Sequence, residues 1–158
     1  MKLQTPLLVG LIVLFGAVSS NQSGQPQAEG QLAALERSAS PQWAVDLSLK
    51  PDTVAVGNLD MAVSIRSARS GYLTLLQRGT DGKEDIVFPN ALDKDNRIEA
   101  DKPVVLPRES WKWKAAPPAG EGRLLAVVSD KPVDTQSLSA SLNGQTYGAA
   151  SAAYRERD

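Results

Sequence analysis

The chain of 158 residues contains no cysteine and no histidine. Without cysteine it cannot form disulfides, thiol nucleophiles or thiolate metal sites, and we expect no lipid anchor carried by an N-terminal cysteine. Without histidine it lacks Ser-His-Asp triads, Cys-His dyads and imidazole metal sites. Its 17 basic and 18 acidic side chains nearly balance, so it lacks the strongly basic surface typical of nucleic-acid binding. We therefore expect no enzyme, no cofactor, no metal site and no nucleic-acid partner.

The first residues have the pattern of an export signal. Lys2 precedes an almost uninterrupted apolar run over residues 6–18, and Ala17 and Ser19 are the small residues that a signal peptidase reads. We expect a signal peptide over residues 1–19 and a bacterial protein that is periplasmic or secreted. The alternative is an uncleaved membrane anchor, although a helix of this run would span only about 20 Å at about 1.5 Å per residue.

Two segments are poor in the side chains that build a core. Residues 20–42 and 134–158 are rich in Ser, Gln, Gly and Ala, which predicts a flexible linker and a flexible C-terminal tail. Leu32 and Leu35 are spaced as on one face of a helix, so a short docked helix is the alternative within the linker. The alternative for the tail is a segment that becomes ordered when it binds a partner.

Between these segments, residues 43–133 contain short apolar runs separated by turn residues at regular spacing. The runs cover residues 45–49, 61–65, 71–76, 86–88, 104–106, 110–114 and 124–128. Asp81-Gly82 predicts a type I′ hairpin turn. The pattern predicts an all-β domain, a small Ig-like antiparallel β-sandwich. We expect residues 45–49 to form the open edge strand, because the linker leads directly into them.

The order of these segments resembles a bacterial family of unknown function, DUF4384, over roughly residues 47–132. The resemblance is carried by Gly71-Tyr72-Leu73-Thr74-Leu75-Leu76, Asp81-Gly82-Lys83, Val87-Phe88-Pro89-Asn90, Asn96-Arg97-Ile98, Pro107, Gly120 and residues 128–132. It implies a β-sandwich module without established catalysis, found beside kinases and caspase-like proteases and in envelope proteins, some of them accessory parts of secretion or surface assemblies. It brings no catalytic residues.

Turn and strand chemistry explains the family motif without a ligand. Proline ends a strand because it cannot donate to the ladder, and Asn and Gly suit turns. We therefore interpret the motif residues as structural: Gly71, Asp81, Gly82, Phe88, Pro89 and Asn90.

The candidate binding residues are Trp111, Trp113 and Tyr72. Residues two apart in a strand share a face, so both indoles either cover the core or form a flat patch that stacks on a glycan. The acidic loop from Asp93 begins like a calcium-binding loop, but Arg97 and Ile98 occupy positions where that loop requires a ligand and a glycine. No metal site is expected there.

These observations favour an exported, non-catalytic protein-binding or scaffolding module of the bacterial cell envelope. Short strands with an open edge favour a protein partner, bound by strand addition or face-to-face docking. The alternative is a glycan- or peptidoglycan-binding module that uses Trp111 and Trp113. The sequence leaves the oligomeric state open.

Overall fold

The computed structural model describes residues 30–58 and 61–158. The predicted signal peptide and the first part of the predicted linker lie outside these residues. The elements, in chain order, are α1 (Gln31–Ser38), β1 (Val45–Lys50), β2 (Thr53–Ala55), β3 (Ala62–Ser67), β4 (Gly71–Arg78), β5 (Glu84–Phe88), β6 (Arg97–Ile98), β7 (Val104–Leu106), β8 (Gly120–Ser129), α2 (Leu138–Leu142) and β9 (Tyr147–Arg157). No helix of the described part is long and apolar enough to cross a membrane.

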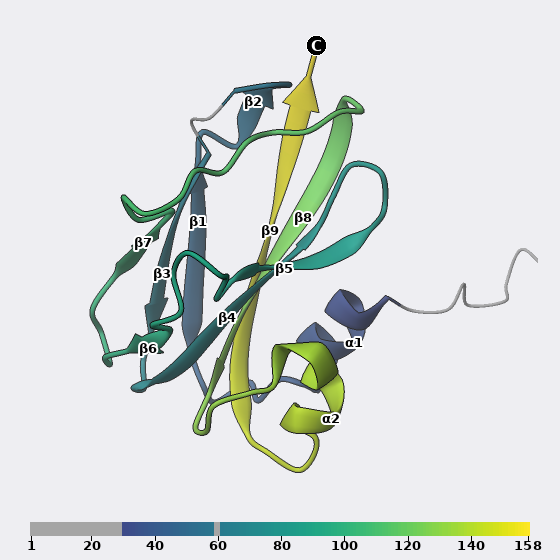
Figure 1. The fold of residues 1–158 in the computed structure, drawn as a ribbon. Coiled ribbons are helices and arrows are strands. Elements are labelled where there is room, and N and C mark those ends of the chain that lie inside the picture. Colours follow the sequence, from purple (N-terminus) through teal and green to yellow (C-terminus); the bar gives the residue numbers. More distant parts are fainter. Residues whose placement is uncertain (1–29, 59–60) are drawn as a thin grey trace, which may run out of the picture.

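The strands form two sheets that face each other across an apolar core (Figure 1). One sheet has the order β1-β3-β7, and the other has the order β2-β9-β8-β4-β5, with β6 pairing to the first two residues of β4. The predicted all-β sandwich is confirmed. One strand pair departs from the antiparallel pattern, because the chain changes sheets after β1 and β2 then pairs parallel to β9.

Two helices add a third layer on the outer face of the larger sheet (Figure 1). Their buried leucines pack against side chains of β4, β8 and β9. This second cluster contains Leu32, Leu35, Leu76, Leu125, Val127, Leu138, Leu142 and Tyr147. The central strand β8 is therefore buried on both faces, which explains why residues 124–128 are apolar without alternation.

The predicted flexible linker is wrong for its second half, which contains α1. Leu32 and Leu35 are buried against the larger sheet, as the docked-helix alternative required. The Tyr147 hydroxyl donates a hydrogen bond to the Leu35 carbonyl at 2.6 Å, which ties α1 to the start of β9. The helix is held by burial of its apolar face rather than by its intrinsic propensity, as is usual for a helix this short.

The predicted flexible tail is also wrong, because residues 147–157 form β9 inside the larger sheet. This strand pairs with β8 from Ser129↔Tyr147 to Gly120↔Glu156 and with β2 on its other side. Its sequence is rich in Ala and Gly, which are weak strand formers, so composition suggested disorder. The small side chains serve packing: a Cβ atom at Gly148 would lie 2.6 Å from the Trp43 ring.

The turn at Asp81-Gly82 exists in a wider form than the predicted type I′ turn. Gly82 has a φ of 84°, whereas the φ of Asp81 is not positive. The Gly79 amide donates to the Lys83 carbonyl at 2.8 Å, and the Gly82 amide donates to the Gly79 carbonyl at 2.9 Å. This pattern is that of a three-residue hairpin loop, in which only the last residue needs positive φ.

Candidate binding site

The two predicted binding indoles lie together but inside the core. Trp111 is 7% exposed and Trp113 is 6% exposed, with ring centroids 6.3 Å apart and planes tilted by 38°. Their segment alternates as expected, with Lys112 and Lys114 exposed, although it belongs to no strand. Two buried rings offer no flat surface to a sugar. The glycan-binding alternative requires exposed indoles, so this burial leaves it without support.

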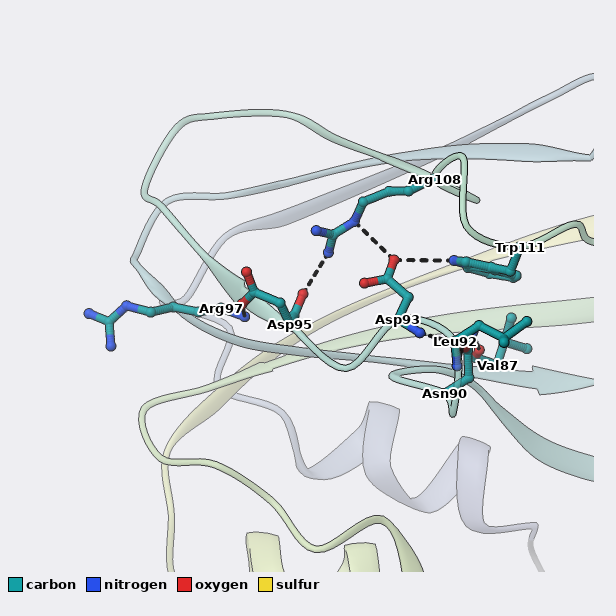
Figure 2. A network of polar contacts seen from close by, with 8 residues as sticks. All are labelled: Val87, Asn90, Leu92, Asp93, Asp95, Arg97, Arg108 and Trp111. Carbon is teal, nitrogen blue, oxygen red and sulfur yellow. Dashed lines mark hydrogen bonds and ion pairs between the residues drawn. The ribbon is translucent and has the colours of Figure 1, made fainter.

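Trp111 also takes part in a polar network that holds the acidic loop (Figure 2). Its Nε1 donates to Asp93 Oδ2 at 3.2 Å, and Arg108 Nε lies 3.1 Å from the same oxygen. The Arg108 guanidinium also donates to the Asp95 carbonyl at 2.6 Å and lies over the Phe88 ring at 5.2 Å. Asp93, the first residue of the calcium-like pattern, thus joins the loop to the core.

The motif residues have structural roles as well. Asn90 Nδ2 donates to the Val87 carbonyl at 3.0 Å, while its Oδ1 accepts from the Leu92 and Asp93 amides at 2.9 and 3.0 Å. Pro89 follows the last residue of β5, the fully buried Phe88. At Gly71 a Cβ atom would lie 2.5 Å from the Ser129 carbonyl oxygen, so close strand packing requires glycine there.

Replacing Asp93 by alanine should destabilise the fold by about 1–3 kcal/mol, because Trp111 Nε1 and the Arg108 guanidinium each lose a half-buried partner. Urea unfolding followed by tryptophan fluorescence measures the loss. Asp95→Ala is the matched control, since Arg108 binds the Asp95 main chain and that carboxylate is exposed. We expect less than about 0.5 kcal/mol for the control. Equal losses in the two variants would contradict the assigned role of Asp93.

Tyr72 lies apart from the indoles. Its neighbour Leu73 points into the core, so Tyr72 points to the opposite face of the sheet. Arg97 stacks over its ring at 5.7 Å and donates from Nη1 to its hydroxyl at 3.3 Å. The three predicted binding residues therefore do not form one site.

Over residues 30–58 and 61–158, no helix or strand covers the outer face of the smaller sheet, and its strand β7 has one free edge (Figure 1). Ser48, Ser64 and Val105 are direct cross-strand neighbours on that face, where a shallow depression measures about 310 Å³. Val105 is 57% exposed. In the described part of the chain, β7 pairs with β3 alone, which leaves its outer backbone groups without a strand partner.

The strand predicted to be the open edge, β1, is an edge strand of this sheet, because its ladder pairs it only with β3. However, β1 lies close to β9 of the opposite sheet, at the side where the chain crosses between sheets. The strand at the other edge, β7, lies at the outside of the sandwich in Figure 1. The more open edge is therefore β7 rather than β1.

A polar pocket of about 130 Å³ lies at one end of the larger sheet, beside residues 114–117, and sequence reasoning missed it. Glu156 is the central residue: it is 3% exposed, and among the described residues its Oε2 has no hydrogen-bond partner. Beside it, the Tyr154 hydroxyl accepts a hydrogen bond from Gln77 Nε2 at 2.6 Å. The signal was the spacing of Tyr154 and Glu156, which share a face if the C-terminal segment is a strand.

The ionisation of this pocket is set mainly by burial. Burial raises the pKa of the Glu156 carboxyl and the charge of Asp81 raises it further, while hydrogen bonds with the Ala116 backbone and the Thr80 side chain lower it. Burial also raises the pKa of the Tyr154 hydroxyl, against a lowering by its hydrogen bond to Gln77. The pocket therefore holds a desolvated carboxyl group that an added positive charge would stabilise in its ionised form.

Comparison with known families gives one match. The family described as a domain of unknown function (DUF4384) matches residues 53–132, from β2 to the residues that follow β8. No curated protein and no solved structure matches the chain. The match covers half of the chain and contains the Gly71, Asp81-Gly82 and Phe88-Pro89-Asn90 positions described above. The chain belongs to the DUF4384 family.

Proposed function

We propose that the protein is an exported, non-catalytic protein-binding or scaffolding module of the bacterial cell envelope, acting as an accessory part of a secretion or surface assembly. The export signal predicted from the sequence of residues 1–19 supports the location. The contrast between the two sheets supports the binding role. Two helices cover the outer face of the larger sheet, whereas no described element covers that of the smaller one.

The observation that carries the proposal is the edge strand β7. An extended segment of a partner can add to it through main-chain hydrogen bonds, as in other cases of strand addition. Val105 supplies an apolar contact next to the small side chains of Ser48 and Ser64, which leave room for a docked segment. Because β7 has only three residues, its edge alone is short, and contacts on the neighbouring face must supply part of the affinity.

The experiment is affinity capture of the full chain from fractionated cells, comparing the wild type with Val105→Lys. A charge on an edge strand opposes strand addition, and the exposed side chain tolerates the change. Leu92→Lys is the matched control, because Leu92 is the other exposed large hydrophobic residue of the described part and lies in a loop.

We expect to find the chain in the periplasm or the medium. We also expect the wild type and Leu92→Lys to capture an envelope protein, and Val105→Lys to capture at least tenfold less of it. Capture of no specific protein by the wild type would overturn the binding role. Equal capture by Val105→Lys would overturn the use of β7. A chain that remains in the cytoplasm would overturn the location.

A further inference from the structure

The pocket at the end of the sandwich is built from five separate segments. The end of β4 provides Gln77, the hairpin loop provides Thr80 and Asp81, β5 provides Asp85, the segment after the indoles provides Lys114, and the end of β9 provides Tyr154 and Glu156. These polar groups line a space of about 130 Å³. At about 30 Å³ per water molecule, that space suits about four water molecules or one small polar group.

Glu156 is the main acceptor of the pocket. Its side chain is buried, and the Ala116 backbone and the Thr80 side chain form hydrogen bonds with its carboxyl group. In the described part of the chain its Oε2 has no hydrogen-bond partner, which is rare for a carboxylate oxygen in a folded protein. Within the described residues, the ion pairs involve other acidic side chains and not Glu156. A positively charged ligand in the pocket would give this oxygen a partner, and the surrounding groups fit such a ligand.

The charge of the lining favours a cation. Asp81, Asp85 and Glu156 are acidic and Lys114 is the one basic residue among the lining residues. Lys114 forms no ion pair with these carboxylates in the described part of the chain. Over residues 30–58 and 61–158, no three acidic side chains are grouped closely enough to hold a metal ion. The cation that fits is therefore an organic group with several donors.

A guanidinium group matches the acceptors that the pocket presents. It has five N–H donors in a planar fork, whereas an ammonium group is a compact point charge. The carboxylate of Glu156, the lone pairs of the Tyr154 hydroxyl and the side-chain oxygen of Gln77 can each accept from one edge of such a fork. The four heavy atoms of the group agree with the volume of the space.

We propose that this pocket holds the guanidinium group of an arginine side chain presented by the partner protein. The source of the arginine rests on the proposed function, whereas the recognition of a guanidinium group rests on the pocket itself. The pocket lies at the end of the sandwich, at the last residues of β4 and β9, whereas the β7 edge lies along its side (Figure 1). The two features are separate, so they can be tested independently.

The test titrates the full chain with Nα-acetyl-L-arginine amide and follows three backbone amide signals by NMR: those of Tyr154, Glu156 and Gly122, which lies against the Tyr154 ring. Nα-acetyl-L-citrulline amide, which is neutral, and Nα-acetyl-L-lysine amide are the ligand controls. We expect saturable shifts with the arginine probe at these amides and at least tenfold weaker binding of both controls. Binding of citrulline amide equal to that of arginine amide, or no saturable shift with arginine, would overturn the proposal. Equal binding of lysine amide would overturn the guanidinium assignment.

Two variants locate the binding. Glu156→Gln keeps the shape of the side chain and should weaken arginine binding at least tenfold, and Tyr154→Phe should weaken it severalfold by removing one acceptor. Glu99→Gln is the matched control, because Glu99 is an exposed acidic residue paired with Lys102. Wild-type affinity in Glu156→Gln would overturn the site. If Glu156→Gln does not fold, Tyr154→Phe decides.

Affinity capture with the same variants separates this inference from the proposed function. Loss of the partner in Glu156→Gln, together with loss of arginine binding, would support both. Partner capture unchanged in Glu156→Gln would overturn the partner as the source of the arginine and leave the β7 interface standing. Capture of no partner by the wild type would overturn the proposed function and with it that source, while the arginine titration still decides what the pocket recognises.

Discussion

A chain that ends at residue 146 is expected not to fold, because it lacks β9. That strand lies between β2 and β8 in the larger sheet and pairs with β8 along its whole length. It also supplies Tyr154 to the core between the sheets and Tyr147 to the cluster under the helices. Its removal would open a central ladder and both apolar clusters. Circular dichroism and NMR signal dispersion of the purified truncated chain measure the result.

The control for this truncation removes Asp158 alone, which is exposed and lies beyond β9. That change should leave the thermal midpoint within about 1–2 °C, as expected for a surface change of less than about 0.5 kcal/mol. A cooperative unfolding transition in the chain that ends at residue 146, close to that of the full chain, would show that β9 is dispensable. The boundary of the domain would then lie where composition alone places it.

The strands that the sequence predicts well are those that are apolar on at least one face. Residues 45–49, 71–76 and 124–128 carry branched or large apolar side chains, and each lies within an observed strand. The element that composition hides is β9, whose Ala and Gly residues let Trp43 and the helices approach the sheet. The family match ends at residue 132 and so gives no signal for β9.

For the candidate sites, too, the sequence pattern does not show which segments cover a residue. Alternation places Trp111 and Trp113 on one face, and the structure confirms this, but alternation does not say whether that face is core or surface. That depends on which segments cover it, which is a tertiary property. Glu156 could not be placed at all while residues 134–158 were interpreted as a tail. Pairing with β8 puts it opposite Gly120, at the end of the sandwich.

Trp43→Ala is expected to cost about 3–5 kcal/mol, the range for removing a large aromatic side chain from a core. Trp43 is 2% exposed, and its ring packs against Gly148 at the start of β9. Its Nε1 donates to the buried Ser67 Oγ at 2.9 Å, which joins the segment before β1 to the end of β3. Because domains of this size have about 5–15 kcal/mol of total stability, the variant should be near the limit of folding. Urea unfolding at 25 °C measures the loss.

Two further variants separate the volume of the ring from its hydrogen bond. Ser67→Ala removes the acceptor and leaves the indole N–H buried without it, which should cost about 1–3 kcal/mol. Trp43→Phe retains much of the packing against Gly148 and should lose less than Trp43→Ala. A loss below about 1 kcal/mol in Trp43→Ala would contradict the packing described here.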